Sequence, residues 1–189
     1  MNVDTDASPA VRKQAMQTII EQVVDNLDAS PSDNVKSFLL HVGWHEGAQL
    51  LHRTQIGGGP GRSFFQFEPP LAKDAVAYAK QKGWLGKLAE GTGHTEAEIE
   101  SAGAALPTHG GLWNGSLMET LLTSSDLFGT YLCRIALRKL PSEIPAGVDA
   151  HAEYWAAHWK RVFDSDNDRL DKKAQFVKNA NEVDSLRSG

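Results

Sequence analysis

Glu46 is the residue of this sequence with the surroundings that a general acid needs. Trp44 lies two positions before it, and Val42 and Leu39 lie about one and two helical turns earlier. Because apolar neighbours disfavour a charged carboxylate, a carboxyl group among them keeps its proton near neutral pH. Such a group can protonate the leaving oxygen of a glycosidic bond. The alternative is a solvated glutamate at the C-terminal end of a helix.

A second segment whose residues could take part in the chemistry follows about twenty residues later, at Ser63-Phe64-Phe65-Gln66-Phe67-Glu68. Its phenylalanines are expected to return to the region of Glu46 and to cover it with apolar surface, or else to be ordinary core residues. Glu68 is the nearest candidate for the second carboxylate that many glycosidases use as a base or nucleophile. It can equally serve to fix the loop.

Helices are predicted to position these two segments. Ser8-Pro9 is typical of a helix start and predicts a helix over 9–28, and a second amphipathic helix follows the break at 30–32 and ends at Gly47. Glu46 therefore falls in its last turn. Later helices are predicted over 72–81, from Thr95 to about Leu106, from Ser116 onward with a restart at Asp126, and over 149–163. The helices that begin at Thr95 and Ser116 each have the sequence of a capping box.

Residues 48–68 break the helical pattern, with a glycine-rich turn at Gly57–Gly61 between two short apolar segments. The segment predicts either a small β-hairpin or an irregular lobe. The chain is thus expected to be a mainly α (α+β) domain over residues 1–163, with a cleft between this lobe and the helices after residue 115. Residues 164–189 form a charged tail that we expect to be helical.

The sequence HVGWHEGAQLLHRTQIGGGPGRSFFQFEP, which spans residues 41–69, resembles the signature of lytic transglycosylases and goose-type lysozymes. It is most similar to small bacteriophage-encoded lysozyme-like proteins. In that group a helix ends with the catalytic glutamate, and a Gln-Ile-Gly-Gly stretch and an aromatic-Gln-aromatic-Glu segment follow. SDLFGTYLCRIALRKLPSEIP and HAEYWAAHWKR resemble the later helices of the same group. The resemblance covers residues 35–162.

The resemblance implies a lysozyme-like fold that cleaves the glycan strands of peptidoglycan, as a muramidase or a lytic transglycosylase. It assigns Glu46 as the acid, Gln66 to a hydrogen bond with sugar or backbone near the acid, and Phe65 and Phe67 to the apolar wall of the site. It implies that one acid can suffice, because the N-acetyl group of the substrate can act as the nucleophile, and it implies no cofactor. Tyr154, Trp155 and Trp159 are expected either to stack on sugar rings or to pack in the core.

Two residues depart from the pattern of this group. Gly47 follows the acid where the group usually has serine, and Ser63 stands where it has a glycine that packs backbone against backbone. The acid itself is retained. The departures leave open a weakly active or inactive relative, which would be a virion structural protein that keeps the lysozyme-like fold.

A metal site is not expected from the histidines near Glu46. His41 and His45 share a helix face, but Gln49 stands where a zinc protease needs its second histidine. The acidic run 164–168 begins like a calcium loop, yet Arg169 replaces the required glycine. Cys133 is the one cysteine and lies in an apolar run, so we expect a buried thiol.

The composition suits one folded domain, with 41% hydrophobic residues and a net charge of −5 over 189 residues. That charge gives no broad basic surface for nucleic acid, and no apolar run has the length for membrane insertion. The first fourteen residues lack a secretory signal, so export by the usual route is not expected. The lack of a signal suits either a virion-borne enzyme or a lysis enzyme released through a membrane lesion. Together with the resemblance, we expect a bacteriophage virion protein that acts at the host cell wall. Its C-terminal tail is a candidate for contact with other virion proteins.

Overall fold

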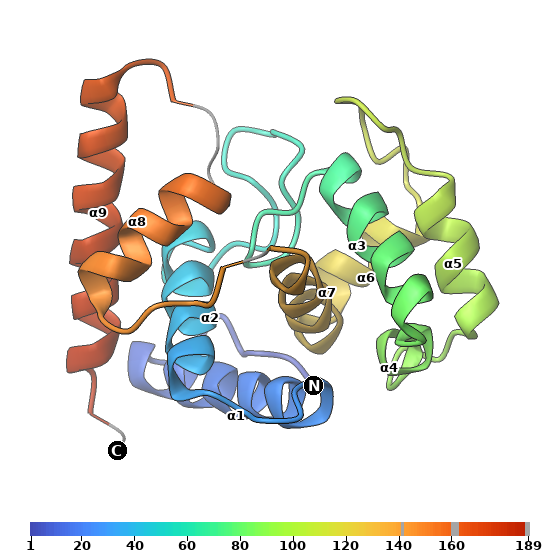
Figure 1. Cartoon of the computed structure of the whole chain (residues 1–189), viewed down its shortest axis with the longest axis horizontal. Coiled ribbons are helices and arrows are strands. Elements are labelled where there is room, and N and C mark those ends of the chain that lie inside the picture. The colour runs from blue at the N-terminus through green and yellow to red at the C-terminus, as the bar shows by residue number, and fades with distance from the viewer. Residues whose placement is uncertain (141, 160–162, 188–189) are drawn as a thin grey trace.

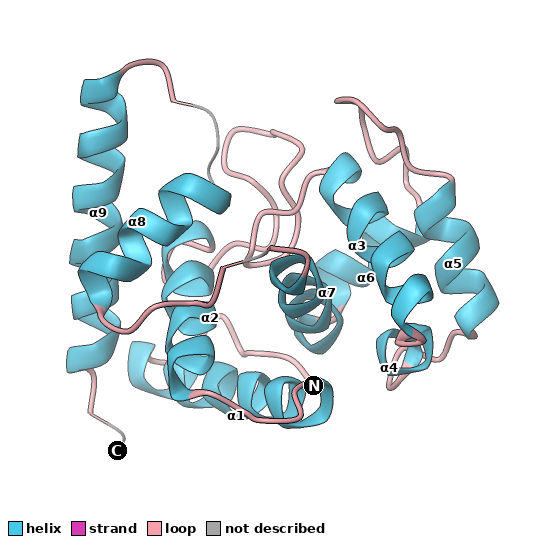
Figure 2. Cartoon of the chain, viewed as in Figure 1, coloured by secondary structure: helices cyan, strands magenta, loops and turns pink. Residues whose placement is uncertain are grey.

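The computed structural model describes all residues except 141, 160–162 and 188–189, and in these residues the chain is helical, with no strand (Figures 1 and 2). The mainly α prediction is confirmed. The helices are α1 (Pro9–Leu27), α2 (Asp33–Glu46), α3 (Pro69–Lys82), α4 (Leu85–Ala89), α5 (Glu96–Ala104), α6 (Leu117–Ser124), α7 (Asp126–Arg138), α8 (Val148–His158) and α9 (Asp166–Ser185). None of the described helices is long and apolar enough to span a membrane.

Helix α7 is the centre of the fold. Every residue from Asp126 to Leu137 is buried, which is the pattern of a helix surrounded on all sides. It packs against α1, α2, α3, α4 and α6. In Figure 1 it lies between two groups, with α2, α8 and α9 on one side and α3, α4 and α5 on the other. The two segments singled out from the sequence adjoin this helix.

The predicted helix ends are largely confirmed, with one correction. Thr95 and Glu98 form the expected capping box at the start of α5. At α6, Ser116 caps the helix by accepting a hydrogen bond from Glu119 N, but the reciprocal bond is not made. The Glu119 carboxylate instead binds the Arg62 guanidinium, with a nitrogen–oxygen distance of 2.7 Å. Its other oxygen, Oε2, accepts a hydrogen bond from Gly115 N at 3.1 Å, so both carboxylate oxygens have partners and the box is half formed.

Residues 47–68 form the irregular lobe, the second of the two predicted alternatives. Two isolated bridges, Thr54 with Arg62 and Arg62 with Phe67, take the place of the β-hairpin. Ala48, Gln49 and Leu50 have φ angles of 47°, 63° and 60°, in the left-handed region. Strand pairing cannot begin directly from that conformation, because it turns the chain sharply after α2.

The charged C-terminal segment forms helix α9, which packs against α2 and α8. Phe176, Ala180 and Val183 are its buried residues. The acidic run 164–168 forms the start of this helix, where Ser165 accepts a hydrogen bond from Asp168 N. The predicted helix over 149–163 is present as α8 up to His158, and residues 160–162 lie outside the described part.

A buried ion pair fixes the lobe to α7 and to the N-terminal segment. Arg53 donates from Nε to Asp126 Oδ1 and from a terminal nitrogen to Oδ2, each at 2.7 Å. The same guanidinium donates to Val3 O and lies 4.5 Å from the centre of the Phe64 ring. The Asp126 side chain is fully buried, so its charge depends on these donors.

Arg53→Met should lower the free energy of unfolding by about 3 kcal/mol, because it leaves the buried Asp126 carboxylate without its cation. Urea denaturation measures this change. The combined variant Arg53→Met with Asp126→Asn should recover part of the loss, and Arg187→Met, at an exposed position, should have little effect. A stability of Arg53→Met equal to that of the wild type would contradict the role of this ion pair.

Candidate active site around Glu46

Glu46 is the last residue of α2 and is half-buried. Its Oε1 accepts a hydrogen bond from Trp155 Nε1, on α8, at 2.8 Å. Trp155 is itself buried and stacks on Phe176 of α9, with ring centres 5.1 Å apart. The ring of His45 also contacts the indole edge to face, with ring centres 4.9 Å apart, so the Trp155 N–H points in a defined direction toward the Glu46 carboxyl group.

Cys133 lies on α7 close to the same carboxyl group. It is fully buried, as the sequence predicted. Burial raises the pKa of the Cys133 thiol well above its ordinary value, and the negative charge of Glu46 acts in the same direction. A thiol in this state stays protonated and is a poor nucleophile. The chemistry available here is therefore that of the carboxyl group.

The aromatic segment 64–67 is buried beside α2. Phe64, Phe65 and Phe67 are each 1% exposed or less. A Cβ placed on Gly43 would lie 3.3 Å from the ring of Phe65, so Phe65 packs closely on α2 one turn before Glu46. These residues are core residues and at the same time an apolar wall near the acid.

Helix α8 joins the two segments through its tryptophans. Trp155 holds Glu46, and Trp159, one turn later, donates from Nε1 to Phe65 O at 3.2 Å. The Trp159 ring also meets Phe67 edge-on, with centres 5.5 Å apart. The sequence offered sugar stacking or packing for these tryptophans, and in the structure both make packing and hydrogen-bond contacts with the motif. The role of Trp155 as partner of the acid was missed, since nothing in the spacing of residues 109 positions apart indicates it.

The polar members of the second segment serve the lobe. Gln66 donates from Nε2 to Ser63 O at 3.0 Å. Its Oε1 is buried against Gly61 and has no hydrogen-bond partner among the described residues. Of the two predicted partners, sugar or backbone, the bond seen is to backbone. Glu68 is exposed at the N-cap position of α3 and makes no capping bond.

Gly47 and Ser63, the two residues that depart from the pattern of the lysozyme-like group, have a steric explanation. A Cβ on Gly47 would lie 2.7 Å from Gly43 O and 2.9 Å from a ring carbon of Phe64, so serine does not fit there unless both the end of α2 and the aromatic segment shift. Ser63 is buried and has a φ angle of 62°, and its Oγ accepts a hydrogen bond from Phe65 N. A Cβ on Gly129 of α7 would lie 2.9 Å from this Oγ. The glycine needed for close approach is therefore on α7 and not at position 63.

The histidines near the acid form hydrogen bonds between helices. His41 Nδ1 lies 2.9 Å from His151 Nδ1, and His41 Nε2 lies 3.0 Å from Asp184 Oδ1. His151 Nε2 donates to Pro145 O. This pair links α2, α8 and the end of α9.

His45 and His52 belong to other surroundings. Asn179 of α9 donates to His45 Nδ1 at 2.9 Å, and His52 is exposed in the lobe. The described residues contain no group of three or more side chains that could hold a metal ion.

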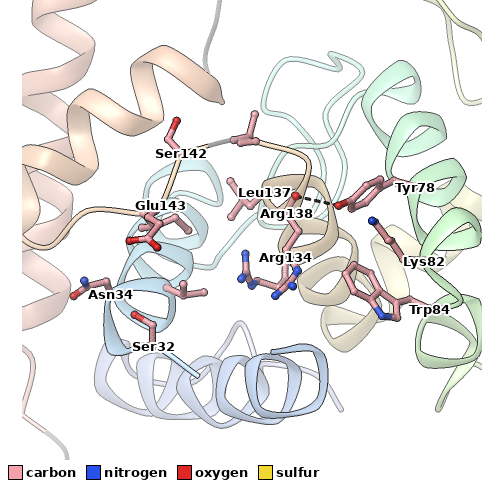
Figure 3. A pocket seen from close by; sticks show the side chains of 13 residues that line it. Ser32, Asn34, Tyr78, Lys82, Trp84, Arg134, Leu137, Arg138, Ser142 and Glu143 are labelled. Carbon is pink, nitrogen blue, oxygen red and sulfur yellow. Dashed lines mark hydrogen bonds between the residues drawn. The ribbon is translucent and has the colours of Figure 1, made fainter. Parts of the chain in front are cut away.

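A groove lies at the other end of α2, between the start of α2, the end of α3 and the last turns of α7 (Figure 3). None of the site residues predicted from the sequence lines it.

Comparison with protein-family models, with curated proteins and with solved structures finds no match.

The stability of the protein should decrease as the pH falls from 6.5 to 4. Burial and the charge of His41 lower the pKa of His151 to about 4, below its unfolded value of about 6.5. The folded state therefore binds fewer protons in this window, and about 3 kcal/mol of stability present above pH 6.5 is lost on acidification. Urea denaturation at several pH values should show a flatter profile for His151→Gln than for wild type. His109→Gln, at an exposed loop position, should keep the wild-type profile, and a parallel loss in His151→Gln would contradict the assignment.

Gly129→Ala should destabilise the protein by about 1–3 kcal/mol, because the added methyl group meets Ser63. Alanine favours a helix over glycine by about 1 kcal/mol, so a purely local effect would have the opposite sign. Adding Ser63→Gly should restore most of the loss, and a double-mutant cycle in urea measures the coupling. A stabilising Gly129→Ala without coupling to Ser63 would exclude this contact as a constraint.

Proposed function

We propose that this protein cleaves the glycan strands of peptidoglycan, as a muramidase or lytic transglycosylase, with Glu46 as the general acid. The observation that carries the proposal is the position of Glu46. Its carboxyl group ends α2, is held by the Trp155 indole and adjoins the buried aromatic segment 64–67. The resemblance of residues 35–162 supplies the substrate class.

In the proposed reaction, Glu46 gives its proton to the glycosidic oxygen as the bond to the anomeric carbon breaks. The electron pair of that bond leaves with the oxygen, and positive charge develops on the sugar. The carbonyl oxygen of the substrate's own N-acetyl group can then bond to the anomeric carbon. Attack by water completes a hydrolysis, whereas attack by a hydroxyl of the same sugar gives an anhydro-sugar. Glu46 takes the proton from the attacking group and returns to its starting state.

The backbone around Glu46 supports a functional site. Of the six described non-glycine residues with a left-handed φ, five lie between positions 48 and 66 and so belong to the lobe that follows the acid. Each such conformation costs roughly 1–3 kcal/mol, and strained residues of this kind cluster at active sites. The proposal accounts for them as the means of bringing the aromatic segment back to α2.

On the basis of the resemblance we also propose that the protein is part of a bacteriophage virion, where wall cleavage would help breach the host envelope. Peptidoglycan is then its main partner. Other virion proteins could bind the outer face of α9, whose inner face packs on α2 and α8. With a net charge of −5, nucleic acid is not a proposed partner.

A structural role is the second candidate, and one observation favours it. The bond from Trp155 to Glu46 helps hold α8 on α2, so the carboxyl group has a use in the fold itself. In this alternative the chain is a virion component that keeps the helical domain as an interaction module and does not cut glycan strands.

Purified peptidoglycan incubated with the wild type should release soluble fragments, and Glu46→Gln should release at least 100-fold less, in keeping with the loss of a general acid. Glu21→Gln, at an exposed position on α1, should release as much as wild type. Mass spectrometry of the fragments distinguishes anhydro-sugar from reducing ends, and thermal unfolding shows that each variant is folded. No release by folded wild type, or equal release by Glu46→Gln, would reject the proposal and favour the structural role.

A further inference from the structure

The groove of Figure 3 has a volume of about 610 Å³, which is within the range of ligand sites. Its walls are the start of α2, the end of α3, the last turns of α7 and residues 140 and 142–144. Three cationic side chains line it, namely Lys82, Arg134 and Arg138. We call it the basic groove. Glu143 lies at its opposite side, across from Lys82 in Figure 3.

The floor of the basic groove has more positive than negative charge. Arg134 and Arg138 both bind the buried carboxylate of Asp28, with nitrogen–oxygen distances of 2.8 Å and 2.7 Å. One carboxylate neutralises one guanidinium, so the pair leaves about one unit of positive charge beside the groove. Lys82 adds another, and the described residues give it no ion pair. This is a local excess in a protein whose net charge is −5.

The aromatic residues of the basic groove hold cations. The Arg138 guanidinium lies 5.2 Å from the centre of the Trp84 ring, and Lys82 Nζ lies 5.5 Å from that of Tyr78. Tyr78 also donates from its hydroxyl group to Arg138 O. One face of each ring is thus taken by a cation. These contacts favour recognition of carboxylates by Arg138 and Lys82 over stacking of a sugar ring on Trp84 or Tyr78.

We propose that the basic groove binds an acidic peptide, with carboxylates on Lys82 and Arg138 and a free amine on Glu143. The stem peptides of peptidoglycan have this chemistry, since they carry several carboxylates and, in many walls, an amine. This identity of the peptide rests on the proposed function. The distribution of charge, with cations on one side and one carboxylate on the other, fits a short zwitterionic chain that lies across the groove.

The position of the basic groove relative to Glu46 gives it a separate role. Val35 lines the groove and Glu46 ends the same helix, so they are about 16 Å apart along α2. A peptide bound beside Val35 would therefore lie away from the bond that is cut. It would hold the protein on its substrate between cleavage events.

The test is binding of a free stem tetrapeptide, without sugar, to the intact protein by isothermal titration calorimetry. Lys82→Gln and Arg138→Gln should each weaken binding about tenfold, which corresponds to about 1.4 kcal/mol. Lys80→Gln is the matched control, because Lys80 lies two residues earlier on α3 and binds Glu100 outside the groove. The same peptide with its carboxylates esterified should not bind.

No saturable binding of the peptide, equal affinity of the three variants, or equal binding of the esterified peptide would overturn the assignment of the groove. This readout uses no cleavage, so it is independent of Glu46. If the protein bound the peptide but released no fragments, the groove would stand and the proposed function would fail. If fragments were released without peptide binding, only the inference about the groove would fail.

Discussion

The hydrogen bond from Trp155 to Glu46 is the interaction on which the arrangement of the candidate site depends. It connects the end of α2 to α8 across 109 positions of sequence. Two further contacts of α8 act with it, from Trp159 to Phe65 and from His151 to His41. Helix α8 thereby fixes the acid and the aromatic segment in one unit. Helix α9 supports this unit from behind, because Phe176 stacks on Trp155.

The same contacts give Glu46 two roles, one in the proposed reaction and one in the packing of the helices. A general acid needs a defined orientation and apolar surroundings, and a hydrogen bond from a buried indole supplies the first. A carboxyl group in that position also stabilises the packing of α8 on α2. Trp155 and Trp159 therefore both hold the helices together and form part of the surroundings of the acid. Catalytic and structural roles of Glu46 are therefore separated by experiments with the substrate and not by measurements of stability.

Much of the helical framework could be predicted from sequence. The N-terminal Ser-Pro pair, the Thr95–Glu98 capping box and the glycine after Glu46 act over a few residues, so helix ends at Pro9, Thr95 and Glu46 followed directly. The failures concern groups that meet across long separations. Arg62 binds the Glu119 carboxylate, 57 positions away, that the second capping box required. No local sequence pattern predicts the Trp155–Glu46 hydrogen bond or the basic groove, because each is formed by residues far apart in the sequence.

A crystal structure of Glu46→Gln with a bound, uncleaved N-acetylated glycan oligomer would test the central claim most directly. The account predicts that a glycosidic oxygen lies within about 3 Å of the side chain at position 46, beside the aromatic segment 64–67. A glycan bound only elsewhere on the protein, with the side chain at position 46 held by Trp155 and remote from any glycosidic oxygen, would contradict it.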